Sequence, residues 1–230
     1  MNHRLTLSGY MGALGMTLMF IGLWPLWNML PPTNASFTAD QMAAFVGEHR
    51  TRILAGSMVN SFAVPLIYWF TGGLTAIFRK MEGECSPLTD AFMMVVIMGY
   101  ATLYCSLVFL IAAAYRPELS PEIVRTLTDI ALVWLVFPGG LGIVQFVIAG
   151  IIILRDKTVP IIFPRWVGYL SVWVGVLSAP SCFVALFKNG PFAWNGILAF
   201  WLPVVTFGIA MTFYLIYMLK AAKHPAFAAK

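Results

Sequence analysis

The chain has 230 residues, of which 60% are hydrophobic and 10% are charged, and its mean hydropathy is +0.86. This composition lies outside the range of soluble globular domains and indicates a protein whose main solvent is lipid. The formal net charge is +5. Its basic residues are scattered and form no groove-sized patch, which argues against nucleic acid as a partner.

Six long apolar stretches are predicted to be membrane-spanning helices. A helix needs about 20 apolar residues to cross roughly 30 Å of hydrocarbon, and lipid offers the backbone of an open strand no hydrogen-bond partners. In chain order the stretches cover residues 7–30, 53–77, 91–114, 129–154, 166–187 and 193–219. The sequence therefore predicts an all-α fold, with residues 1–230 forming one polytopic transmembrane bundle of six helices. The first stretch is too long for a signal peptide, so we expect it to be retained.

The connections between the stretches carry helix start signals. Thr38 and Gln41 have the spacing of a capping box, which predicts a short helix lying on the membrane surface before the second span. Ser86 is expected to start the third span, and the Ser-Pro-Glu sequence at residues 120–122 to start a helix before the fourth. Serine favours the cap position, and proline fits the first helical turn.

Basic residues are concentrated on one side of the predicted membrane. If the N-terminus is inside, the cytoplasmic segments hold about nine of the 14 lysines and arginines, whereas the outer basic residues are nearly balanced by acidic ones. The positive-inside rule therefore predicts that both termini are cytoplasmic, an N-in/C-in topology.

Prolines interrupt the predicted helices at a shared depth. The four deep prolines are Pro65, Pro138, Pro180 and Pro203. Each removes a backbone donor and frees a carbonyl one turn earlier, roughly 10 to 18 Å below the outer border. The Phe-Pro-Gly-Gly sequence at residues 137–140 is the weakest stretch of predicted helix. Because freed carbonyls must face protein or a cavity, this layer predicts an intramembrane cavity in the outer half, with ordinary helix packing as the alternative.

Polar and aromatic side chains near this layer give the candidate ligand-binding residues, which are Asn60, Tyr104, Trp134, Pro138 and Ser181. Polar groups are expensive inside lipid and so mark functional sites, and the 18 phenylalanines and 13 methionines suit an adaptable apolar pocket. Interhelical hydrogen bonds and ordinary packing explain the same residues equally simply. If the break opens a ligand space, alanine at Pro138 and Gly139 should straighten the helix and raise stability; if it serves packing, stability should fall.

The tryptophans divide by depth along the predicted spans. Those near the borders predict an aromatic belt, in which indole rings lie at the headgroup level: Trp24, Trp27, Trp166, Trp194 and Trp201. Three others lie deeper, at Trp69, Trp134 and Trp173.

No catalytic, metal-binding or cofactor pattern is found. The three histidines fall in the two tails and one outer loop, and the three cysteines have no paired spacing, so neither set predicts a metal site. No acidic residue reaches midplane depth, which argues against a proton- or sodium-coupled transporter. Asp129 with Arg116 or Arg125 is interpreted as a border ion pair, and Glu82 and Glu84 as part of a solvated loop.

Two segments near the last spans are distinctive. Residues 163–166 read Phe-Pro-Arg-Trp, and residues 190–196 read Gly-Pro-Phe-Ala-Trp-Asn-Gly. With residues 48–51 and 116–118, they make nearly the whole chain resemble a family of bacterial six-helix integral membrane proteins that carry FPRW and GPFAWNG motifs. The resemblance implies the architecture and a bacterial inner (cytoplasmic) membrane, and it implies no activity or functional residues.

Three functional hypotheses follow. The leading one is a protein that binds or passes an apolar small molecule through the outer-half cavity, with membrane lipid and a hydrophobic ligand as partners. The second is a structural or accessory subunit that packs against itself or against a partner membrane protein. The third is a membrane-embedded enzyme without a recognisable motif, which would use residues such as Asp129, Tyr104 or Arg116.

Overall fold

A computed structural model describes residues 2–28 and 30–227. The described chain is built of helices: α1 (His3–Ile21), α2 (Ala39–Glu82), α3 (Pro87–Tyr115), α4 (Pro121–Val136), α5 (Gly139–Leu154), α6 (Arg165–Leu177) and α7 (Leu202–Ala221). Three of these helices are extended by short segments of π-helix or 3-10 helix. The π-helix η1 (Gly22–Leu26) follows α1, the 3-10 helix η2 (Ala179–Ala185) follows α6, and the π-helix η3 (Ile197–Trp201) precedes α7. A last turn, η4 (Pro225–Phe227), ends the described chain.

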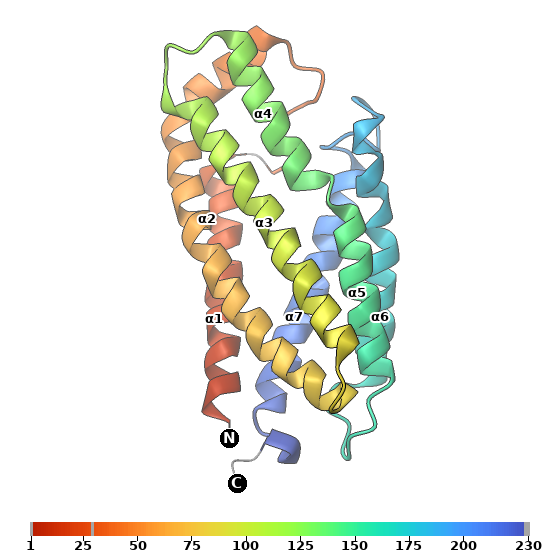
Figure 1. The fold of residues 1–230 in the computed structure, drawn as a ribbon. Coiled ribbons are helices and arrows are strands. Elements are labelled where there is room, and N and C mark those ends of the chain that lie inside the picture. Colours follow the sequence, from red (N-terminus) through yellow and green to blue (C-terminus); the bar gives the residue numbers. More distant parts are fainter. Residues whose placement is uncertain (1, 29, 228–230) are drawn as a thin grey trace.

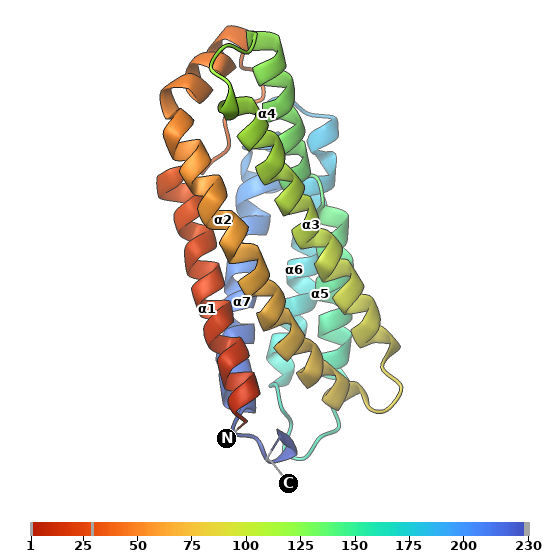
Figure 2. The same cartoon turned by 60° about the vertical axis from the view of Figure 1, so that its left-hand side comes forward.

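Six helical segments are long and apolar enough to cross a membrane. They are His3–Leu26, Ala39–Glu82, Pro87–Tyr115, Pro121–Leu154, Arg165–Ala185 and Ile197–Ala221. The predicted all-α bundle of six spans is therefore confirmed, with α4 and α5 forming one span. The first and last described residues lie at the same end of the bundle (Figures 1 and 2), where the Asn2 amide donates to the Ala222 carbonyl at 2.6 Å. We call this end the proximal end and the opposite end the distal end.

Helix α2 corrects the prediction of a separate surface helix before the second span. The capping box is present, with Thr38 accepting from the Gln41 amide and Gln41 from the Thr38 amide, but the helix then continues unbroken for 44 residues. At 1.5 Å per residue this is about 66 Å, twice the hydrocarbon thickness. Its start therefore reaches the distal end beside the start of α4 (Figure 2), where Arg50 donates to the carbonyls of Ala114 and Tyr115 at the end of α3. Those bonds satisfy carbonyls that have no partner within α3.

Close backbone contacts hold neighbouring helices together. In α5 and α6, a methyl group built on Gly150 would lie 2.8 Å from the Gly168 carbonyl oxygen, and one built on Gly168 would lie 3.2 Å from that of Gly150. Between η1 and α2, Gly22 lies directly against the Asn60 side chain. Small residues at such contacts are how membrane helices gain packing energy without a hydrophobic driving force.

The proximal core is aromatic, and the first of the two sequence motifs belongs to it. Phe163 of the Phe-Pro-Arg-Trp motif is fully buried in one cluster with Phe78, Phe146 and Tyr214. Tyr214 lies 2.6 Å from the Ser171 hydroxyl, so its polar group is satisfied inside this core. The motif therefore anchors the start of α6.

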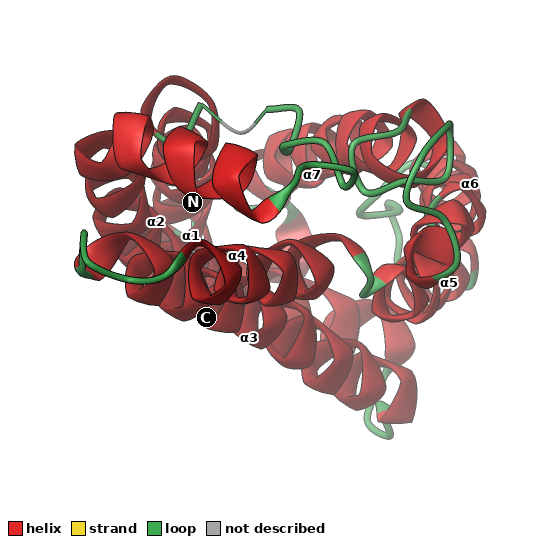
Figure 3. Cartoon of the chain, turned by 90° about the horizontal axis from the view of Figure 1, so that it is seen from above, coloured by secondary structure: helices red, strands yellow, loops and turns green. Residues whose placement is uncertain are grey.

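Two border tryptophans do not form the predicted aromatic belt. Trp27 is fully buried, and its indole N–H donates to the Ser57 hydroxyl at 3.1 Å. Trp194, in the second motif, is also buried, and its indole N–H donates to the Thr33 carbonyl at 2.6 Å. That bond ties the last distal loop to the first. The belt prediction is wrong at these positions because Trp27 packs against α2, where Gly56 lies directly against its ring, and Trp194 is held between the loops at the distal end (Figure 3).

The proximal loop between α2 and α3 also differs from the prediction. Glu82 was expected to be solvated, but its carboxylate accepts hydrogen bonds from the backbone amides of Leu88 and Thr89 and from the Thr89 hydroxyl, at 2.7 to 2.9 Å. The carboxylate thus caps α3, because the first amides of a helix have no partners within it. Ser86 does occupy the cap position, as predicted, but makes no side-chain cap bond.

Candidate functional site

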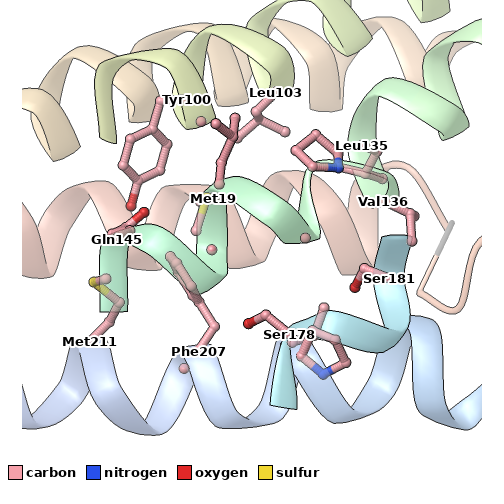
Figure 4. A pocket seen from close by; sticks show the side chains of 18 of the residues that line it. Met19, Tyr100, Leu103, Leu135, Val136, Gln145, Ser178, Ser181, Phe207 and Met211 are labelled. Atoms are coloured by element: carbon pink, nitrogen blue, oxygen red, sulfur yellow. The ribbon is translucent and has the colours of Figure 1, made fainter. Parts of the chain in front are cut away.

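A cavity of about 540 Å³ lies inside the bundle and extends towards the distal end. Its walls come from α1, α3, the junction of α4 with α5, the junction of α6 with η2, and α7. Figure 4 shows these elements around it, with Met19, Leu103 and Phe207 among the apolar lining side chains. A volume of this size is typical of small-molecule pockets.

The junction between α4 and α5 forms one wall. Pro138 separates the two helices, and the Gly139 amide donates to the Phe137 carbonyl at 2.6 Å instead of to the carbonyl four residues earlier. The predicted weak point at residues 137–140 is therefore a break. Gly139 lies so close to η2 that an added methyl group would be 2.5 Å from the Ser178 carbonyl oxygen. Alanine at Gly139 would therefore clash, which removes the expectation that a double alanine change straightens the helix without cost.

The break and η2 place two serines on the cavity wall. Ser178 donates its hydroxyl proton to the Val174 carbonyl, and Ser181 donates to the Ala199 carbonyl, both at 2.8 Å. Both hydroxyls point towards the cavity in Figure 4. Since each proton is already used, the serines can offer the cavity only an acceptor oxygen.

A second polar pair lies deeper, at the end of the cavity nearer the bundle centre. Tyr100 on α3 and Gln145 on α5 both line the cavity, and Figure 4 shows their side chains directed towards one another. Gln145 is 6% exposed, and its Nε2 has no hydrogen-bond partner among the described residues. A buried amide without a partner is costly, so its presence on a cavity wall needs an explanation.

The cavity opens sideways between α1 and α7. The exposed residues of its lining belong to these two helices, with Phe20 on one side and Val204, Val205, Gly208 and Thr212 on the other. At the proximal end the same helices are packed tightly, because a methyl group on Gly9 would lie 2.6 Å from the Leu219 side chain. The opening is therefore confined to the distal half, and it faces the surface that lipid would cover.

Two of the five predicted site residues line this cavity. They are Pro138 and Ser181. Asn60 is fully buried in the interface between α1 and α2, beside Gly22, and its Nδ2 and Oδ1 have no partners among the described residues. Tyr104 and Trp134 are 45% and 37% exposed on α3 and α4, and neither is part of the lining.

Of the four deep prolines, only Pro138 and Pro203 reach the cavity. Pro65 lies on the exposed side of the unbroken α2, and Pro180 lies in the first turn of η2. The lining also contains Tyr100, Gln145 and Ser178, which were not among the site residues predicted from sequence. The signal that could have selected Ser178 is its place two residues before Pro180, where a helix is expected to end.

Among the described residues that line the cavity, none has an acidic, basic or histidine side chain. Within residues 2–28 and 30–227, no group of three or more histidine, cysteine, aspartate or glutamate residues could hold a metal ion. The expected border ion pair is present, with Arg125 Nε 3.7 Å from Asp129 Oδ2, while Arg116 pairs instead with Glu118. What the lining offers is apolar contact with a few neutral hydrogen-bonding groups, an arrangement suited to holding a ligand.

Comparison with known proteins found no matching family model, no matching curated protein and no matching solved structure.

Proposed function

We propose that this protein binds or passes an apolar small molecule through the cavity between α1, α3, α5 and α7. The observation that carries the proposal is a cavity of about 540 Å³, mainly apolar, that opens sideways between α1 and α7 within the membrane-spanning region. A ligand dissolved in the lipid can enter such a site without crossing water. The lining methionines, among them Met16, Met19 and Met211, suit ligands of varied shape.

The proposal includes a location and an orientation. The resemblance of the two sequence motifs to bacterial six-helix membrane proteins supports a bacterial inner membrane. The proximal end carries most of the basic residues, including Arg79, Lys80, Arg155 and Lys157, which supports a cytoplasmic proximal end. The cavity then lies in the outer half of the membrane.

Two glycines allow the cavity to be filled without disturbing the fold. Gly99 lines it from α3 and Gly208 from α7, and a methyl group on either would meet no atom within 4 Å. Gly99→Leu and Gly208→Leu should therefore place a side chain at the cavity without a clash at Cβ. Gly72, exposed on α2 and equally free of neighbours, gives the matched control Gly72→Leu.

The test is intact-mass analysis of the purified protein in mild detergent, combined with lipid extraction. We expect wild type and Gly72→Leu to retain a hydrophobic molecule and the two filling variants to lose it while remaining folded. Full retention by folded Gly99→Leu and Gly208→Leu would refute the proposal. A protein that carries no small molecule but remains a stable oligomer would favour the structural-subunit hypothesis instead.

A further inference from the structure

Gln145 is the residue that the proposed function leaves unexplained. An apolar ligand alone requires no polar group on the cavity wall, yet this side chain is more than nine-tenths buried, lines the cavity and has an Nε2 without a partner. A leucine or methionine in its place would give apolar contact without the cost of an unsatisfied amide. The Gln145 amide is therefore expected to have a partner that enters with the ligand.

Tyr100 faces the same point from α3. Its ring packs edge-to-face against Tyr68 at a centroid distance of 5.8 Å, which fixes the side chain on the cavity wall. The Tyr68 hydroxyl already donates to the Ile97 carbonyl, whereas the Tyr100 hydroxyl has no such bond to the described residues. A tyrosine hydroxyl and a glutamine amide nitrogen are both donors. Gln145 Nε2 has almost no exposed surface, so the amide must make a half turn, which exchanges its oxygen and nitrogen at little cost, to donate into the cavity.

The remaining polar groups define which ligand head fits. The hydroxyls of the lining serines and threonines, Ser178, Ser181, Thr102 and Thr212, all donate to backbone carbonyls, so the free donors of the described lining are at Tyr100 and Gln145. None of the described lining residues carries a charge that could balance an ionic head, and burying an unpaired charge is strongly unfavourable. A neutral acceptor satisfies both conditions, and a carbonyl oxygen, with two lone pairs, can accept from both donors.

The ligand's direction follows from the position of the opening. The two donors are buried and belong to α3 and α5, whereas the exposed lining residues, among them Phe20 and Val205, belong to α1 and α7. A ligand whose polar head lies at the two donors must therefore extend its apolar part towards the opening between α1 and α7.

We infer that the cavity binds an uncharged amphiphile with a carbonyl group, held by hydrogen bonds from Tyr100 Oη and Gln145 Nε2, with its hydrocarbon chain leaving between α1 and α7. This inference rests on the proposed function and narrows it to a ligand class. It also explains why an amide without a partner is present at Gln145, which packing alone does not explain.

Three probes of similar chain length separate the contributions: dodecane, methyl laurate and laurate. Binding to the full-length protein is measured by the probe-dependent rise in Tm in one detergent. For wild type we expect methyl laurate to bind most tightly, dodecane more weakly and laurate, at neutral pH, weakest. Tyr100→Phe and Gln145→Met keep the volume of the side chains, and each should weaken methyl laurate binding by roughly three- to tenfold while leaving dodecane unchanged.

The outcomes distinguish this inference from the proposed function. If methyl laurate binds no better than dodecane, if laurate binds as well as the ester, or if both variants weaken dodecane equally, the carbonyl site is refuted while the apolar cavity stands. If no probe binds to wild type, the proposed function itself fails. Misfolding is controlled by the Tm without probe, which Gln145→Met should not lower because it removes a buried amide without a partner.

Discussion

Replacing Gly139 by alanine adds a methyl group to the tightest contact in the wall of the cavity. That methyl would lie 2.5 Å from the Ser178 carbonyl oxygen, 2.7 Å from Ser181 Cβ and 3.3 Å from the Cys182 amide nitrogen. Two of the three neighbours are backbone atoms, which cannot swing away as a side chain can. The end of α6 and the start of η2 must therefore move by about 0.9 Å before the contact becomes ordinary.

The expected cost follows from two opposing terms. Overpacking of this kind typically destabilises by about 1–3 kcal/mol. Alanine recovers up to about 1 kcal/mol, because glycine is the poorer helix former. Gly139→Ala should therefore lower the free energy of unfolding by about 1–2 kcal/mol, and it should displace the two serines that η2 places on the cavity wall.

Gly140 provides a control one residue away. A methyl group there would have only Cys182 Sγ nearby, at 3.9 Å, so Gly140→Ala gains helix propensity without a clash. Its expected effect is a stabilisation of about 0.5–1 kcal/mol. Both variants are to be compared with wild type by thermal and denaturant unfolding in the same detergent, followed by circular dichroism. A Gly139→Ala variant as stable as Gly140→Ala would show that η2 does not pack against the break as described.

Two other contacts and the orientation in the membrane give further predictions. Trp194→Phe should cost about 1–2 kcal/mol in denaturant unfolding, because it removes the buried bond between the two distal loops and leaves a carbonyl unpaired. Glu82→Gln should lower Tm by weakening the cap of α3, at a cost of about 1 kcal/mol, whereas Glu84→Gln on the exposed part of the same loop should have no effect. For orientation, an impermeant maleimide should reach the exposed, native Cys85 only from the cytoplasm, and Asn189→Cys in a Cys85→Ser background only from outside; the opposite result would reverse the orientation.

The spans could be predicted from sequence because they depend on a single quantity, the length of an apolar run. The apolar run at residues 91–114 corresponds to α3, which is only slightly longer, at Pro87–Tyr115. The helix starts after Thr38, Ser86 and Ser120 were also predicted correctly. Cap residues act through local hydrogen bonds and steric fit, which sequence spacing is sufficient to indicate.

Which face of each helix points inwards could not be predicted in the same way. In water, one face of a helix is polar and the other apolar, so the pattern gives the direction. In lipid both faces are apolar. Tyr104 was therefore chosen for the site although it is exposed, and the apolar pattern did not distinguish it from Tyr100, which lies on the cavity wall. On the fourth span, Trp134 was likewise chosen although it is exposed, whereas Gln145, which lines the cavity, was not chosen.

Contacts between distant loops were equally beyond the sequence. Trp194 lies at the start of its predicted span, which suggested a place in the headgroup layer. Nothing in the adjacent sequence indicates that its indole N–H donates to the Thr33 carbonyl, 161 residues away in the chain. Such a bond depends on how two loops are brought together by six helices.

The Pro138 break shows why cavity and packing were wrongly treated as alternatives. Sequence reasoning assigned the break to one purpose or the other, so that a stabilising or a destabilising double alanine variant would decide between them. In the structure, the absence of a side chain at Gly139 lets η2 approach, and the approach of η2 is what places Ser178 and Ser181 on the cavity wall. One contact thus serves both purposes, and a variant that relieves it would alter stability and cavity shape together. Substitutions that leave the break intact and change only the cavity, at Gly99 and Gly208, are therefore the ones that can test binding separately from folding.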